Sequence, residues 1–268
     1  GKGAIEFDAD PQVARERRRL NELLTAAKSG DQPTLLAEEL ADIVLKWEEE
    51  FGHQPAAWLP LAPTGFASSD GSTLKLQGDH SILASDIRPE KDTYTITASS
   101  PVTKLTALRL DVLTDDSLPL KGPGRQDNGN LHLSEFEAFV VEPEATERTP
   151  LKIKKATADW DQSGWTISHA LDGNVATAWG IYPKVGASHY AVFELDEPVT
   201  LKPSSQLVVV LKQLHGGGHL IGRAKLYATD APGASANVLP ETVLAAMKIE
   251  RDQRSDEQRT AVAAHALR

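Results

Sequence analysis

The hexapeptide Gln206-Leu207-Val208-Val209-Val210-Leu211 decides the fold class of this chain. Its apolar residues occupy both alternating faces of an extended segment, which is typical of a strand that is covered on both sides. Two other segments, Thr93-Tyr94-Thr95-Ile96-Thr97 and Leu108-Arg109-Leu110-Asp111-Val112, alternate with the period of two expected of strands with one buried face. A doubly covered strand among alternating strands predicts β-sheets packed face to face.

Short strand-like segments separated by turn signals fill residues 58–232. Clusters of Gly, Pro, Asn and Asp separate them, and no helical pattern of useful length intervenes. Further strands are expected near residues 74–76, 81–84, 131–141, 152–158, 190–195 and 220–228. The pattern predicts a mainly β fold, an antiparallel β-sandwich or jelly roll over residues 58–232. This region forms either one elaborated jelly roll or two sub-sandwiches, over residues 58–142 and 149–230.

Helical patterns flank the β-region at both termini. Asp10-Pro11 supplies an N-cap and a first-turn proline, and apolar residues then recur at steps of three and four, which predicts a helical hairpin within residues 1–57. Ser255-Asp256-Glu257-Gln258 has the pattern of a capping box, and helices are predicted over residues 238–268. We expect the two helical regions to pack together, or against another domain of a longer parent chain.

Composition narrows the classes of function. The 268 residues include 28 Lys+Arg and 38 Asp+Glu, giving a net charge of −10, which disfavours nucleic acid as a partner. The absence of cysteine excludes disulfides, thiolate metal sites and a haem-attachment motif. No apolar run reaches the roughly 20 residues of a membrane span, so membrane insertion is not expected. The chain begins without Met or a signal peptide, and we expect a piece of a longer protein whose targeting sequence is absent.

The most specific local pattern is Leu171-Asp172-Gly173-Asn174-Val175-Ala176-Thr177-Ala178-Trp179. It resembles the motif of discoidin, or coagulation-factor type C, domains, whose galactose-binding-like β-sandwich is shared by many carbohydrate-binding modules. The resemblance implies that the Asp-Gly-Asn turn and Thr177 belong to a calcium loop. Leu133-Ser134-Glu135-Phe136-Glu137 resembles the family's final strand, in which a Glu completes the metal site, although here this segment precedes the loop.

The residues themselves support two interpretations of this region. Glu135 shares the alternation phase of Leu131 and Leu133, and an inward carboxylate is costly unless it is paired or bound to a cation. Asp172, Thr177 and Glu135 would offer the hard oxygen ligands that suit Ca²⁺. In the alternative, Asp172 and Thr177 only form hydrogen bonds within their own turn. Of these two interpretations we predict the first, a structural calcium ion, which requires Asp172 and Glu135 to lie side by side.

A longer resemblance runs from about residue 45 to residue 260. It rests on an ordered series that includes Gly122-Pro123-Gly124-Arg125, Gly129-Asn130-Leu131-His132-Leu133-Ser134-Glu135-Phe136 and His219-Leu220-Ile221-Gly222-Arg223. This series resembles the β-rich middle region of large exported proteins of planctomycetes and related bacteria, which carry a cytochrome c-like segment and helical domains of unknown function. The resemblance implies a secreted or periplasmic multidomain parent, with its neighbouring domains as partners.

Several loop residues are candidates for contact with a carbohydrate. Sugars present C–H surfaces to aromatic rings and hydroxyls to polar side chains, usually on loops at one end of a sandwich. Trp160 and Trp165 lie five residues apart in a polar loop that contains Gly164. Arg125 is either a ligand anchor or the partner of a nearby acid. The remaining candidates are Tyr182, His219 and Asn128.

The segment His215-Gly216-Gly217-Gly218-His219 places two imidazoles around a glycine turn. A zinc site would require a third protein ligand, which the neighbouring sequence does not supply. The alternative is a hairpin turn whose glycines adopt positive φ, with His219 reaching a ligand.

These observations favour non-catalytic binding of a polysaccharide or glycan. The sequence has neither a Gly-x-Ser-x-Gly elbow nor a His-Glu-x-x-His helix. A hydrolase or lyase would require two acids, or an acid and a histidine, to converge in a cleft. The other alternative is a structural module that docks neighbouring domains. Exposure of Trp160 or Trp165 beside Arg125 or His219 would favour binding, whereas burial of both tryptophans would favour the structural module.

Overall fold

The computed structural model describes residues 10–51, 57–145, 147–236 and 239–267. The chain divides into two compact units, each with its own core. Pro55–Val238 form the β-unit, and Gly1–Gln54 with Leu239–Arg268 form the helical unit. Among the described residues, none of the helices is both long and apolar enough to cross a membrane.

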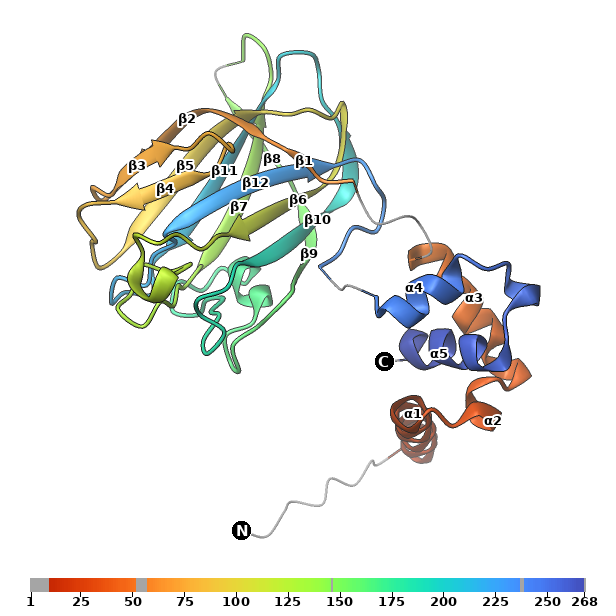
Figure 1. Cartoon of the computed structure of the whole chain (residues 1–268). Helices are drawn as coiled ribbons and strands as arrows, with labels where there is room; N and C mark the ends of the chain where they lie inside the picture. Colours follow the sequence, from red (N-terminus) through yellow and green to blue (C-terminus); the bar gives the residue numbers. More distant parts are fainter. Residues whose placement is uncertain (1–9, 52–56, 146, 237–238, 268) are drawn as a thin grey trace, which may run out of the picture. The chain divides into compact units, whose positions relative to one another are not determined.

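The β-unit is an antiparallel sandwich of two sheets (Figure 1). In the first sheet the strand order is β3-β4-β12-β6-β10-β9, with β1 pairing with β12. Its strands are β1 (Leu59–Pro60), β3 (Thr73–Leu76), β4 (Ile82–Ser85), β6 (Lys104–Val112), β9 (Ile153–Ala158), β10 (His189–Thr200) and β12 (Arg223–Thr229). In the second sheet the order is β2-β5-β11-β7-β8. Its strands are β2 (Ala62–Ser68), β5 (Asp92–Ser99), β7 (Glu135–Val141), β8 (Arg148–Pro150) and β11 (Gln206–Gln213).

The apolar hexapeptide lies in β11, at the centre of the second sheet. It pairs with β5 along one edge and with β7 along the other. Leu207, Val209 and Leu211 belong to the main core, and Val208 and Val210 are buried as well, which confirms the prediction of a doubly covered strand. Both sheets combine strands from the two halves of the β-region, since β6 pairs with β10 and β5 pairs with β11. The β-region is therefore one sandwich, and the alternative of two sub-sandwiches over residues 58–142 and 149–230 is wrong.

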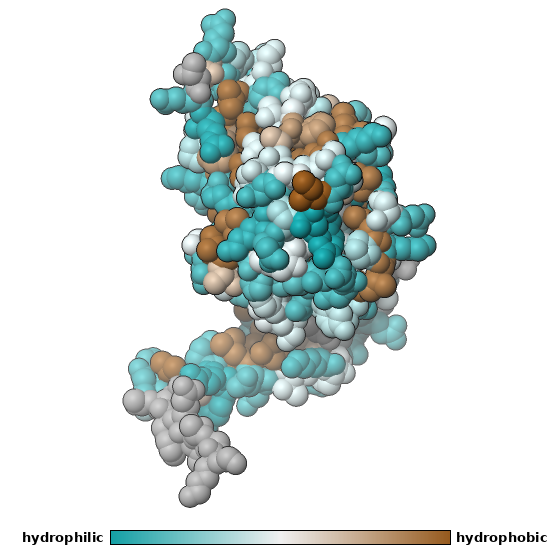
Figure 2. All heavy atoms as spheres, turned by 90° about the vertical axis from the view of Figure 1, so that its left-hand side faces the viewer, coloured by the Kyte–Doolittle hydropathy of each residue, from teal (hydrophilic) through white to brown (hydrophobic). Residues whose placement is uncertain are grey.

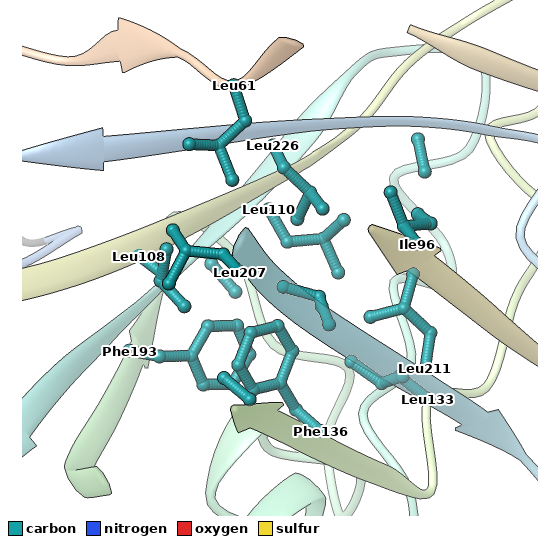
Figure 3. Close-up of a cluster of buried hydrophobic side chains, with 14 of the residues drawn as sticks. Leu61, Ile96, Leu108, Leu110, Leu133, Phe136, Phe193, Leu207, Leu211 and Leu226 are labelled. Atoms are coloured by element: carbon teal, nitrogen blue, oxygen red, sulfur yellow. The ribbon is translucent and has the colours of Figure 1, made fainter. Parts of the chain in front are cut away.

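The core between the sheets is built around an aromatic pair (Figure 3). Phe136 of β7 stacks on Phe193 of β10, with ring centroids 3.6 Å apart and planes 7° apart. Leucines of β6, β11 and β12 surround the two rings. Full burial of each such side chain stabilises the folded state by about 1.5–3 kcal/mol. The packed core therefore fixes the positions of the strand ends and of the loops that follow them.

One predicted strand begins later than expected. The alternation of Leu131, Leu133 and Glu135 predicts a strand over residues 131–141, but β7 begins at Glu135. Residues 131–134 are all buried, and their backbone groups bond to loops: His132 N–H donates to the carbonyl of His219, and Leu133 pairs with Trp179. Tertiary partners therefore override the alternation, and this irregular segment enters the site described below.

The helical unit combines both termini of the chain. Its helices are α1 (Pro11–Ser29), α2 (Gln32–Leu35), α3 (Ala41–Phe51), α4 (Glu241–Met247) and α5 (Asp256–Ala266), with short 3₁₀ turns at Glu38–Leu40 and Arg251–Gln253. The predicted caps are confirmed: Asp10 accepts a hydrogen bond from Gln12 N–H, and Ser255 and Gln258 form a capping box. Ala27 and Leu35 pack with Val262 and other residues of the C-terminal helices in one small core.

Candidate functional site

The loops at one end of the sandwich contain every site residue that the sequence selected except Glu135, which begins β7 beside them. The loops at residues 86–91, 113–134, 159–188 and 214–222 leave this end, because β4, β6, β9 and β11 end there and β5, β7, β10 and β12 begin there. We call it the loop end; it is at the lower left of the sandwich in Figure 1. Figure 2 views the sandwich from that side, and its surface is mostly hydrophilic, with separate hydrophobic spots.

Three histidines converge at the loop end. One ring nitrogen from each of His132, His215 and His219 lies within 4.8 Å of the other two. We call these residues the triple-histidine cluster. The His132 ring lies between those of Trp165 and His219, with centroids 4.4 Å and 4.2 Å away and planes 1° and 10° apart. The His215 ring meets His132 edge-on at 4.6 Å. His132 is buried, His219 is half-buried and His215 is exposed, so the cluster reaches solvent through His215.

Backbone hydrogen bonds fix the segments that carry the cluster. His132 N–H donates to the carbonyl of His219 at 2.8 Å, and Leu214 N–H donates to Ser134 Oγ at 3.1 Å. Gly217 has a φ of +66°, and a Cβ at this position would lie only 3.1 Å from Nδ1 of His219. The glycine turn therefore permits both the tight chain reversal and the position of the His219 ring.

Burial keeps part of the cluster uncharged. Burial of the His132 ring, followed by the nearby His219 and His215, lowers the pKa of His132 from 6.5 to about 3. Burial, followed by His219 and Lys91, also lowers the pKa of His215. Neutral imidazole is the form that binds metals. Nδ1 of His132 is buried and has no hydrogen-bond partner among the described residues.

Both predicted tryptophans are partly exposed. Trp160 packs against the main core, and the Lys184 ammonium lies 5.1 Å from the centre of its ring. Trp165 lies against His132 and makes an edge contact with His215 at 4.8 Å. Trp165 is thus half-buried at the triple-histidine cluster, and its partly exposed ring beside those of His132 and His219 favours ligand binding over a purely structural role.

Tyr182 and Asn128 lie on segments next to Trp165. The side chain of Tyr182 is exposed, and its backbone N–H lies 3.2 Å from both Gln162 Oε1 and Asn130 Oδ1. Gln162 also pairs with Trp165 through a backbone bridge, so the two aromatic residues are on connected segments. Asn128 is exposed, and its side-chain oxygen accepts a hydrogen bond from Asn130 N–H at 2.9 Å.

Arg125 is neither an exposed ligand anchor nor the partner of Asp127, the two roles that the sequence suggested. The residue is only 6% exposed, and its guanidinium donates to Ser72 Oγ and to the carbonyls of Asp86 and Ile87 at 2.8–3.1 Å. It makes no ion pair with Asp127, which binds Arg88 instead. A role for Arg125 as a ligand anchor is therefore not supported. Its guanidinium instead bonds the loop at residues 86–87 to Ser72 of the sandwich.

The predicted calcium residues lie close together. Asp172 accepts hydrogen bonds from Asn174 N–H and Thr177 Oγ1, both at 2.8 Å, as the turn interpretation expects. Glu135 is buried, and its Oε1 has no hydrogen-bond partner among the described residues. Burial, and next the negative charge of Asp172, raise the pKa of Glu135. The two acids are thus neighbours, and calcium binding by Asp172, Thr177 and Glu135 stays a prediction.

Sequence reasoning missed His132. In Leu131-His132-Leu133 the histidine alternates with core leucines, a pattern typical of an outward-facing strand residue. The irregular path of residues 131–134 instead buries it beside His215 and His219, which follow more than eighty residues later. Local sequence held no signal of that approach.

Comparisons with known proteins found similar chains among solved structures alone. No family model and no curated protein matches the chain. Among solved structures, a variant of the family 29 carbohydrate-binding module CBM29-2 is 9% identical, with 69% of this chain and 99% of that chain covered and a TM-score of 0.29. Another variant, complexed with mannohexaose, is 12% identical, with 70% and 100% covered and a TM-score of 0.29. A third, complexed with cellulohexaose, has 11% identity, 69% and 96% coverage, and a TM-score of 0.27. TM-scores below 0.5 do not establish a shared function or a shared site.

Proposed function

We propose that this chain is a non-catalytic carbohydrate-binding module that holds a polysaccharide or glycan at the loop end of its sandwich. The observation that supports this proposal most directly is the partly exposed ring of Trp165, which stacks on the parallel His132 ring with centroids 4.4 Å apart. A fixed aromatic ring offers a large apolar face to the C–H surface of a sugar and loses little conformational entropy on binding.

Neighbouring residues extend the proposed site. The exposed ring of Tyr182 lies on a segment bonded to that of Trp165, and Asn128 offers an exposed amide. Trp160 and His219 complete the proposed set, each with part of its surface exposed. Arg125 is omitted because it is buried and its guanidinium donates to three acceptors within the protein. Structural calcium at Asp172, Thr177 and Glu135 remains part of the proposal, because it would neutralise the buried Glu135 carboxylate.

The cellular setting in this proposal comes from the sequence. The ordered resemblance over about residues 45–260 supports a secreted or periplasmic multidomain bacterial parent, whose other domains would be partners of this chain. Fractionation of cells that express the parent protein tests this point: the chain should be recovered from the periplasm or the medium, and recovery from the cytoplasm alone would contradict it.

Affinity gel electrophoresis with a broad panel of soluble polysaccharides tests the binding function. At least one polymer should retard the protein, and Trp165→Ala should weaken that binding about tenfold or more, equivalent to about 1.4 kcal/mol of lost contact. Phe66→Ala is the matched control, because Phe66 is an exposed aromatic residue on the edge strand β2, outside the loop end. Its binding should stay within about twofold of the unmodified protein, well under the 1.4 kcal/mol of a tenfold change.

Other outcomes would redirect the functional assignment. A panel without any binder would contradict the proposal and favour the structural, interdomain module. Release of new sugar ends from a retarded polymer would favour a hydrolase or lyase. Equal losses in Trp165→Ala and Phe66→Ala would show that binding does not depend on the loop end.

A further inference from the structure

We propose that His132, His215 and His219 bind one divalent transition-metal ion of the zinc class at the loop end. This site is distinct from the predicted calcium site, which uses carboxylates and a hydroxyl. The two proposals share His219, but metal binding by the three imidazoles does not require a bound carbohydrate.

The spacing of the three nitrogens suits a site that closes around an ion. Their mutual distances are at most 4.8 Å, whereas tetrahedral Zn²⁺ with bonds of 2.0–2.1 Å needs nitrogens about 3.3 Å apart. The His132 and His219 rings are stacked with centroids 4.2 Å apart, so an ion in the plane of both requires the His219 ring to turn out of the stack while the exposed His215 moves toward it. His215 and His219 flank three glycines with positive φ. Such a turn can shift by about an ångström without side-chain clashes, since glycine adopts these conformations at little cost.

The hydrogen bonds at the cluster leave suitable nitrogens free. His219 Nδ1 lies 3.1 Å from the carbonyl of Gly216, the usual second-shell contact that fixes the tautomer and leaves Nε2 for a metal. Nδ1 of His132 is buried and unpartnered, which is costly for a polar atom and would be relieved by a metal bond. Nε2 of His132 lies 3.4 Å from Asn130 Nδ2, a weak contact. Metal binding at Nδ1 moves the ring proton to Nε2, so this contact is lost while Asn130 keeps its 3.0 Å bond to Gln162.

The ligand set defines the class of ion. Three neutral imidazoles, with no carboxylate in the cluster, favour Zn²⁺, Co²⁺, Ni²⁺ or Cu²⁺ over Mg²⁺ and Ca²⁺, which prefer oxygen ligands. Among the described residues no fourth histidine or acidic side chain joins the group, so one coordination position of a tetrahedral ion is left without a protein ligand. Water or a ligand hydroxyl would occupy that position.

Metal titration of the full chain, without an affinity tag and freed of metal by chelation, tests the proposal. Calorimetry should show one Zn²⁺ per chain, and Co²⁺ should give the intense visible absorption of tetrahedral coordination, whereas Mg²⁺ should not bind. His215→Ala and His219→Ala should each weaken Zn²⁺ binding at least tenfold. His80→Asn is the matched control, because His80 is an exposed histidine outside the cluster, and its positive φ of 69° is tolerated by Asn. That control should retain the affinity.

Absence of saturable Zn²⁺ binding at millimolar concentration, or equal binding by the unmodified protein, His215→Ala and His219→Ala, would leave the cluster as an aromatic stack only. The exposed His215 keeps the test valid even if His132→Ala does not fold. Because no sugar is used, failure here leaves the carbohydrate assay unaffected, and failure of that assay leaves this one unaffected.

Discussion

Replacing Asp159 by Asn should remove a pH-dependent part of the stability of the sandwich. His189, the first residue of β10, is only 7% exposed, and both of its ring nitrogens face acceptors: Asp159 Oδ2 at 2.9 Å and the Lys184 carbonyl at 2.8 Å. Both nitrogens can donate only in the imidazolium form. Burial by itself lowers the pKa of His189, but the hydrogen bonds to Asp159 and Lys184 outweigh it and raise the pKa above 6.5.

The direction of the pH dependence follows from that shift. A group whose folded pKa is raised contributes stability that is fully present below the unfolded value near 6.5, and that is lost as pH rises through the folded pKa. Hydrogen bonds to charged groups contribute about 1.5–3 kcal/mol, and partial exposure of Asp159 reduces this to about 1–2 kcal/mol. In Asp159→Asn the amide cannot favour the imidazolium, so this contribution disappears at low pH and little changes at high pH.

Thermal unfolding followed by circular dichroism at pH 5.5 and at pH 9 measures the effect. A β-unit of this size should lose about 2–8 °C in Tm at the lower pH, and much less at the higher pH. Asp230→Asn is the matched control, because Asp230 is an exposed acid beyond the opposite end of β12, and its Tm should follow the unmodified protein. Equal Tm losses at both pH values, or an NMR titration that places the pKa of His189 below 6.5, would refute the reasoning.

One further substitution and one chelation experiment test the loop end. Gly124→Ala should lower the free energy of unfolding in urea by about 3 kcal/mol or more, because the added Cβ would lie 1.8 Å from the backbone oxygen of Asn130. Gly78→Ala is the control and should be nearly neutral, because nothing lies within 4 Å of the Cβ it would add. A loss well below this value in Gly124→Ala would contradict the prediction and show that the loop moves to accept the Cβ. Removal of Ca²⁺ with a calcium-selective chelator should lower the Tm of the unmodified protein but not that of Asp172→Asn, since an ion bound only to the folded state stabilises it. An unchanged Tm after thorough chelation would exclude structural calcium at this turn.

Much of the fold could be predicted because its signals are local. The apolar run from Leu207 to Leu211 needs a cover on both faces wherever it lies, and it occupies the centre of a sheet. The capping residues Asp10 and Ser255 accept hydrogen bonds from backbone amides two or three positions away, so their roles could be predicted from adjacent residues in the sequence. The proximity of Asp172 and Glu135 was expected from a family resemblance and from the cost of an unpaired inward carboxylate at Glu135.

The candidate site was harder to predict because its partners are distant in sequence. Arg125 was expected either to anchor a ligand or to pair with a nearby acid, but its guanidinium instead donates to three acceptors from the segments around Ser72 and Asp86. His132 looked like an outward strand residue, but its backbone bonds to His219 and its ring lies beneath Trp165. In both cases the decisive neighbours come from other loops.

The amino-acid sequence by itself determined the sandwich, the terminal helices and the absence of thiol chemistry, since alternation, capping and composition act over a few residues. Only the tertiary structure decided that one sandwich forms instead of two, and that three imidazoles meet at its loop end. The physical reason is that strand pairing and loop packing join segments that lie tens of residues apart. A side chain's burial, and the groups that it faces, depend on those long-range contacts.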